Sequence, residues 1–181
     1  MVFLFSCKQK NGQAQQLFTD DRSEWIERGD ASWSFAGKEL KGTANGGSGF
    51  VMTRRRFANF ILELDFYPDS TINSGVFIRC QGKALSAAEC YELNIWDRHP
   101  DQDSRTGAVV QRSTPLNLVQ TIDRWNHYKI ICRNESIAAW INDQKVVDIR
   151  DSSLIEGFIG LQAAESGSVR FKNVLLTVLK E

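Results

Sequence analysis

The stretch FILELDFY, residues 60–67, alternates between purely apolar side chains and a mixed set of polar and apolar ones. This period of two predicts a β-strand with one buried face. Short polar links at 134–136 and 142–144 predict hairpin turns, and we find no convincing helical period. Further strand-like runs lie at 75–80, 91–96, 127–133, 137–142, 144–149, 157–162 and 169–179. Many short strands with closely spaced turns predict an all-β sandwich or barrel.

Length and charge restrict the classes of protein to which the chain can belong. Its 181 residues fit one domain, and 42% of them are hydrophobic, which is enough for a sizeable core. Basic and acidic residues number 22 each, so no net field attracts nucleic acid or an anionic membrane surface. We recognise no nucleophile elbow, P-loop or dinucleotide fingerprint, and we expect no nucleic-acid partner and no organic cofactor.

The first seven residues (MVFLFSC) form a short apolar run that ends at Cys7. They resemble the end of a bacterial lipoprotein signal, although the charged start and a full-length apolar segment are missing. We therefore predict a signal remnant and polar tether over residues 1–16, lipidation at Cys7, and a single domain over residues 17–181. This implies an extracytoplasmic protein, periplasmic or held by its lipid at the outer membrane or cell surface. The alternative is a frayed apolar terminus.

Cys80 closes one strand-like run and Cys90 opens the next, so a hairpin could bring the two together. In an oxidising compartment they would form a disulfide, and two reduced, buried thiols are an equally good interpretation. The chain has no CxxC motif and no Cys/His set with zinc spacing, which argues against structural zinc.

Two strand-like runs, 76–80 and 91–96, predict a polar sheet face. Their apolar sets (Val76, Ile78 and Cys80; Tyr91, Leu93 and Ile95) are expected to face the core, leaving the alternate residues on the open side. That open side would carry a planar cation, a carboxylate, an amide and two aromatic rings, from Arg79, Glu92, Asn94, Phe77 and Trp96. Such groups suit a sugar, whose hydroxyls pair with polar groups and whose C–H faces stack on rings. The alternative is a surface ion pair between Arg79 and Glu92 that needs no ligand.

The loop that follows, DRHPDQD at residues 97–103, contains three carboxylates and one of the two histidines. Glu92, Asp97 and His99 together offer oxygen and imidazole ligands for one divalent metal ion. A solvated acidic loop is the alternative. His127, next to Trp125 in a predicted strand, is expected to be structural.

Several motifs resemble, in their order and spacing, the family called domain of unknown function 1080 or 3-keto-disaccharide hydrolase. The resemblance runs from Leu17 to Lys180 and includes NSGVFIR (73–79), YELNI (91–95), TGA (106–108), RWNHY (124–128), WIN (140–142) and IGLQ…VRFKN (159–173). Two positions depart from the family: Asn94 stands where members often have glutamine, and Ala163-Ala164-Glu165 stands where many have Asp-His.

The resemblance implies a concanavalin A-like jelly roll of two sheets and a secreted or surface-anchored hydrolase acting on 3-keto-disaccharides or 3-keto-glucosides. A C3 carbonyl acidifies the C2 proton, so a base can expel the C1 substituent by elimination and water can then add. Glu92 or His99 would be the base, and Arg79 or a cation would stabilise the enolate. Asn94, Trp96, Phe77 and Gln162 would bind the substrate.

Three other functions compete with this interpretation. Ordinary glycoside hydrolysis needs two carboxylates, which Glu92 could form with Asp97 or Glu165. A non-catalytic carbohydrate-binding module is favoured by the missing family histidine, because jelly rolls often bind glycans without cleaving them. A structural lipoprotein of an envelope complex would be expected to expose an apolar patch.

Overall fold

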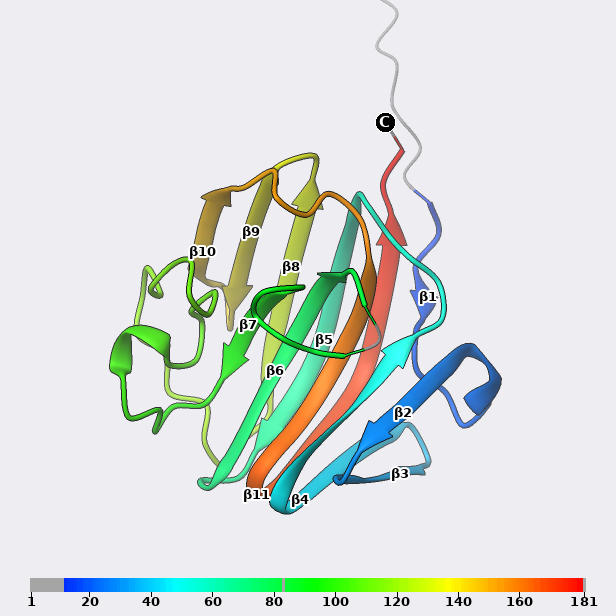
Figure 1. Cartoon of the computed structure of the whole chain (residues 1–181), viewed down its shortest axis with the longest axis vertical. Helices are drawn as coiled ribbons and strands as arrows, with labels where there is room; N and C mark the ends of the chain where they lie inside the picture. The colour runs from blue at the N-terminus through cyan, green and yellow to red at the C-terminus, as the bar shows by residue number, and fades with distance from the viewer. Residues whose placement is uncertain (1–11, 83, 181) are drawn as a thin grey trace, which may run out of the picture.

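The computed structural model describes residues 12–82 and 84–180, and its regular structure is almost entirely antiparallel β-sheet (Figure 1). The all-β prediction is therefore confirmed. The two short 3-10 helices are η1 (Arg22–Glu24) and η2 (Gln102–Ser104). The strands are β1 (Gln15–Gln16), β2 (Trp25–Gly29), β3 (Ser32–Ala36), β4 (Glu39–Thr53), β5 (Phe60–Pro68), β6 (Ile72–Cys80), β7 (Tyr91–Ile95), β8 (Asn126–Arg133), β9 (Ser136–Ile141), β10 (Gln144–Arg150) and β11 (Phe158–Val178).

The strands form two layers because two long strands, β4 and β11, take part in both. The first sheet has the order β7-β6-β11-β4-β2 and uses the first half of β11. The second sheet has the order β10-β9-β8-β5-β11-β4-β3 and uses the second half, with β1 also paired to β11. The pairing of β11 with β4 shifts register between Glu165 and Ser166, where one sheet passes into the other. The jelly-roll sandwich expected from the sequence is thus confirmed.

The core lies between the two sheets. In β5, the apolar residues Phe60, Leu62, Leu64 and Phe66 are fully buried, as the FILELDFY pattern predicts. The first sheet contributes Val76, Ile78, Leu93 and Leu161 to the same cluster. Each such side chain stabilises the fold by roughly 1.5–3 kcal/mol on burial.

The hairpin turns on either side of β9 are also where the sequence predicts them. Asn134 and Asn142 have φ values of 50° and 49°, and Asp143 has 65°. Asparagine and aspartate tolerate this left-handed conformation better than most residues, which explains their use at these turns.

The predicted anchor and part of the predicted tether lie outside the described residues, which begin at residue 12. Gln15 and Gln16 pair with Leu176 and Leu175, so regular structure begins before residue 17. Cys7 lies outside the described residues, and its lipidation stays a prediction. Over 12–82 and 84–180, no helix has the length and apolar run needed to span a membrane.

Candidate functional site

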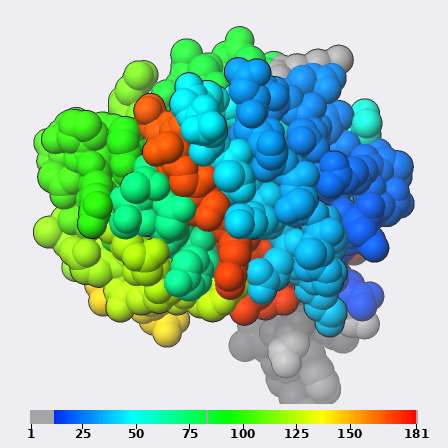
Figure 2. All heavy atoms as spheres, turned by 90° about the horizontal axis from the view of Figure 1, so that it is seen from below, coloured from blue at the N-terminus to red at the C-terminus, as the bar shows by residue number. Residues whose placement is uncertain are grey.

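The outer face of the first sheet carries two cross-strand rows that define the candidate site. One row aligns Glu92 with residues Phe77, Gly160, Met52 and Ile26 on successive strands from β6 to β2. The next aligns Asn94 with residues Gly75, Gln162, Phe50 and Arg28. Figure 2 shows the atoms of β11 as a narrow strip between those of β6 and β4.

Glu92 is the group on this face whose chemistry is most altered by its surroundings. Its side chain is half-buried, and no hydrogen bond or ion pair joins its carboxylate to another residue described by the structure. Burial disfavours the charged form of a carboxyl group and raises the pKa of Glu92 to about 7. A carboxyl group with this pKa can both accept and donate a proton near neutral pH.

Gly75 lies directly beside Glu92. A Cβ atom at Gly75 would lie 3.2 Å from the ring of Phe77 and 3.4 Å from Cγ of Glu92. The missing side chain therefore lets Glu92 and Phe77 pack close against the backbone of β6.

Gln162 pairs with Gly75 on the side away from β7, and its role in binding a substrate stays a prediction. Its side-chain oxygen Oε1 is buried and has no hydrogen-bond partner among residues 12–82 and 84–180. A buried acceptor without a partner costs on the order of 1–3 kcal/mol, which a ligand hydroxyl would recover.

The segment between β6 and β7, described over residues 81–82 and 84–89, crosses this face and is called here the covering loop (Figure 1). The Cys80–Cys90 disulfide closes it at its base, so of the two interpretations left open by the sequence the disulfide is the one observed. Leu85 lies over Gly160, where a Cβ would be only 3.1 Å from both of its δ carbons. Phe77 is on the predicted face but only 1% exposed, in a cluster with Met52 and the disulfide, so it supports the site and does not reach a substrate.

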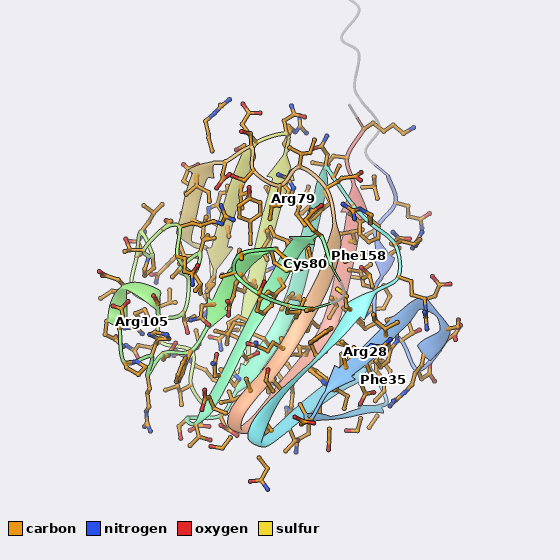
Figure 3. The ribbon with its side chains drawn as sticks, in the orientation of Figure 1. Arg28, Phe35, Arg79, Cys80, Arg105 and Phe158 are labelled. Carbon is orange, nitrogen blue, oxygen red and sulfur yellow. A yellow bond between two sulfur atoms is a disulfide. The ribbon has the colours of Figure 1, made fainter. Side chains whose placement is uncertain are left out.

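Arg79 does not lie on the open face, and this prediction is wrong. Phe77 pairs with Gly160 and Cys80 with Phe158, so β6 has one more residue than β11 between these pairs. This β-bulge, with φ of 54° at Arg79, turns Arg79 inward and Cys80 outward (Figure 3). The guanidinium is fully buried and donates to the carbonyl oxygens of Leu154 and Ala58, each at 3.0 Å.

Asn94 is on the predicted face but is not free to bind substrate. Its amide donates to the carbonyl oxygen of Ser104 and its Oδ1 accepts from the backbone N–H of Ile95. Backbone bonds to Gly107 and Ala108 further fix the TGA segment beside β7. Because Asn94 is 2% exposed, it holds this segment in place and does not contact a sugar.

The predicted metal ligands do not come together. Both carboxylate oxygens of Asp97 are engaged by Thr121, at 2.6 and 2.9 Å, and Arg105 lies 3.9 Å away. His99 is held by Asp101, since its Nδ1 accepts from the Asp101 N–H at 3.0 Å. No cluster of three acidic, histidine or cysteine side chains suited to a metal occurs in the described part of the chain. The triad of Glu92, Asp97 and His99 is therefore wrong as a ligand set, and the divalent cation itself stays a prediction.

Trp96 and His99 form a separate pair beyond the end of β7. Their rings meet edge to face with centroids 4.6 Å apart. Among the described contacts none links either residue to the carboxylate of Glu92. Of the predicted site residues, the structure thus leaves Glu92 and Gln162 on the open face beside Gly75.

Comparisons with known proteins agree with this fold. Residues 11–177 match the sequence profile of the 3-keto-alpha-glucoside-1,2-lyase-like domain. The chain belongs to this family. No curated protein matches it.

Two solved structures of candidate glycosyl hydrolases from Parabacteroides distasonis resemble this family member. One has a TM-score of 0.77 and 22% identity, covering 92% of this chain and 100% of the other. The second has a TM-score of 0.78 and 19% identity, covering 93% and 94%. A carbohydrate-binding module from Bacillus subtilis has a TM-score of 0.63 and 19% identity, covering 83% and 93%. At these identities the likeness establishes the jelly-roll fold.

Gly75 and Leu85 are the site features that the sequence did not reveal. A glycine inside the strand pattern NSGVFIR is a usable signal, because an interior glycine often marks a close approach by a ligand or another side chain. Nothing comparable marks Leu85, whose place over Gly160 depends on how the loop folds.

Removing the Cys80–Cys90 disulfide should destabilise the domain. Replacing both cysteines by alanine releases a loop closed over a sequence separation of 10 residues, and we expect a loss of about 2–3 kcal/mol in the free energy of unfolding. Urea unfolding of the double variant and of the wild-type protein with and without reductant measures this. Replacing the buried free thiol, Cys132→Ala, is the control, because its effect should not depend on reductant. Equal stability of oxidised and reduced wild-type protein would contradict the prediction.

Proposed function

We propose that this domain cleaves 3-keto-α-glucosides by elimination across C1 and C2, followed by addition of water. The observation that carries the proposal is Glu92, a half-buried carboxyl group without a described partner, whose pKa burial raises to about 7. The family description, which names a 1,2-lyase acting on a 3-keto-α-glucoside, supports the same chemistry.

In the proposed first step, the Glu92 carboxylate removes the proton at C2, which the C3 carbonyl acidifies. The electron pair left on C2 forms the C1=C2 double bond as the C1–O bond breaks, and the leaving oxygen takes the proton back from Glu92. Water then adds across the double bond, giving a free 3-keto sugar. A single acid–base group with a pKa near the working pH suits both proton transfers.

Gln162 is proposed to position the sugar. Its amide N–H can donate to the C3 oxygen, where negative charge develops, and its Oε1 can accept from a hydroxyl. Gln162 pairs with Gly75, and Glu92 lies against Gly75 on the same face, so a sugar ring laid across this part of the face would contact both.

The ordinary two-carboxylate mechanism is not favoured. Glu165 lies five residues beyond the row of Glu92 along β11, roughly 16 Å at the rise of a strand. Paired carboxylates of glycosidases are at most about 9.5 Å apart. Asp97 is buried against Thr121 and cannot take its place.

A carbohydrate-binding module is the second candidate function. It is favoured by Ala164, which lies on the open face next to Gln162 and is opposite Asn73 and Ser48. Because many members carry Asp-His directly after this glutamine, the chain has lost a polar group beside the proposed site. The carbohydrate ligand is common to both functions.

We also propose an extracytoplasmic location. The Cys80–Cys90 disulfide supports it, because such bonds persist in oxidising compartments and are rare in the cytosol.

The proposal is tested by incubating the purified protein with p-nitrophenyl 3-keto-α-glucoside and with unoxidised p-nitrophenyl α-glucoside, each with and without EDTA or added divalent metal. We expect nitrophenol release from the 3-keto compound alone, with exchange of the C2 proton in D₂O. Binding of the 3-keto sugar without turnover in any of these conditions would favour the binding module. Equal cleavage of the unoxidised glucoside would contradict the elimination mechanism.

A further inference from the structure

A second hollow, of about 410 Å³, lies on the outer face of the second sheet and contains none of the candidate site residues described above. It spans β5, β8, β9 and the β9–β10 turn, strands that lie side by side in Figure 1. Its lining is an indole ring, an isoleucine, two carboxylates, a lysine and an imidazole, from Trp140, Ile131, Glu63, Asp143, Lys129 and His127. The volume is within the range of small-ligand sites.

The register of the strands explains why these side chains meet. Glu63, Lys129, Trp140 and Lys145 are paired in one row across β5, β8, β9 and β10. Neighbours in such a row have Cβ atoms about 5 Å apart, so the row forms a continuous strip with Trp140 between two lysines. The Nζ atom of Lys145 lies over one face of the indole, 5.4 Å from the ring centroid, which leaves the other face for a ligand.

The polar groups along the strip are held in place by one another. The Nδ1 atom of His127 is 2.9 Å from Oδ1 of Asp65, whose Oδ2 accepts from Asn173 at 2.7 Å. On the other side, Oε1 of Glu63 is 3.7 Å from both Nε2 of His127 and Nζ of Lys129. Groups fixed before binding lose less entropy when a ligand arrives.

These groups remain open to solvent although they are fixed. The side chains of His127, Lys129 and Glu63 are 46%, 42% and 38% exposed. Carboxylates and cationic side chains are interspersed around the hollow, so neither a strongly anionic nor a strongly cationic ligand is favoured. Along the strip, hydrogen-bond donors and acceptors alternate beside an aromatic ring.

We infer that this hollow, with Trp140 as its stacking platform, is a second binding site for a neutral oligosaccharide. Sugar hydroxyls pair with the fixed carboxylates, lysine and imidazole, while a C–H face of the ring lies on the indole. The site is on the opposite side of the sandwich from Glu92, so it holds a glycan without acting on it. It does not depend on the proposed elimination chemistry.

The test uses the full chain carrying Glu92→Gln, so that turnover does not interfere, and a panel of maltotetraose, cellotetraose, laminaritetraose and xylotetraose. We expect at least one of them to bind in isothermal titration calorimetry, Trp140→Ala to weaken that binding at least tenfold, and Trp140→Phe to stay within about threefold. Trp125→Ala is the matched control on the same face, because two cations, Lys172 and Arg170, lie over its ring at 3.8 and 4.8 Å, whereas Trp140 has only the more distant Lys145 at 5.4 Å. It should leave the affinity unchanged.

Two results would overturn the inference: no binding of any tetrasaccharide, or binding that Trp140→Ala leaves intact. Thermal unfolding of each variant checks that the fold is kept. Turnover of the 3-keto-α-glucoside by Trp140→Ala alone should equal that of the wild-type protein, so failure of this site and failure of the proposed function give different results.

Discussion

Replacing Glu92 by glutamine should lower the turnover of a 3-keto-α-glucoside by 100-fold to 10,000-fold and, above neutral pH, should make the folded protein more stable. The loss of activity follows because glutamine cannot accept the C2 proton, and general acid–base groups typically contribute that factor. The gain in stability follows because glutamine has no charge to bury. A merely structural carboxylate would not give both results together.

The sign of the pH effect comes from the raised pKa. Burial raises the pKa of Glu92 from its ordinary value of 4.5 to about 7 in the folded protein, so folding favours its protonated form. As the pH rises from below 4.5 to above 7, the wild-type protein should lose on the order of 2–3 kcal/mol that the glutamine variant keeps. The two proteins should therefore differ little at pH 4.5 and most at pH 8. Urea unfolding at both pH values measures the difference.

The same pKa predicts the activity profile. Because the base must be deprotonated in the free protein, kcat/KM should rise with pH and level off above about 7. Glu165→Gln is the matched control: an exposed glutamate at the bend of β11 undergoes the same change and should lose no activity. If Glu165→Gln instead reduced turnover as much as Glu92→Gln does, the two-carboxylate mechanism would have to be reconsidered.

The sequence predicted those parts of the fold that depend on local periodicity. Strict alternation placed Phe60, Leu62 and Leu64 in the core and Glu92 on the open face. Alternation fails at Arg79, because a bulge changes the count of residues between two strands and no residue type announces it. The bulge therefore explains why Arg79, which the sequence predicted to lie on the surface, is buried.

Other site residues were misjudged because their partners are distant in the sequence. The carboxylate of Asp97 accepts a hydrogen bond from the backbone N–H of Thr121, 24 positions later, and the amide of Asn94 donates to the carbonyl oxygen of Ser104. Both look like free polar groups when only their own strand and loop are considered. Whether such a side chain is free to bind a ligand depends on which residues a distant loop brings next to it. Neither the spacing of residues nor the composition specifies that.

Replacing Arg79 by alanine should destabilise the protein by about 3–5 kcal/mol and leave the chemistry at Glu92 in place. Its guanidinium joins two connections of the chain, through the carbonyl oxygens of Leu154, between β10 and β11, and of Ala58, between β4 and β5. Truncation leaves both acceptors without this donor and opens a cavity in the core. For a chain of this length the midpoint of thermal unfolding should fall by roughly 10 °C.

Arg56→Ala is the control that separates a buried arginine from an exposed one at the same end of the sandwich. Arg56 also contacts the connection between β10 and β11, through the carbonyl oxygen and carboxylate of Glu156, but its side chain is 36% exposed. Its removal should therefore cost less than about 1 kcal/mol. If Arg79→Ala were as stable as Arg56→Ala and inactive toward the 3-keto-α-glucoside, Arg79 would be acting on the substrate, as its place in the NSGVFIR motif first indicated. A large loss of stability, with turnover retained in the folded fraction, would instead show that Arg79 serves to hold the β4–β5 and β10–β11 connections in place.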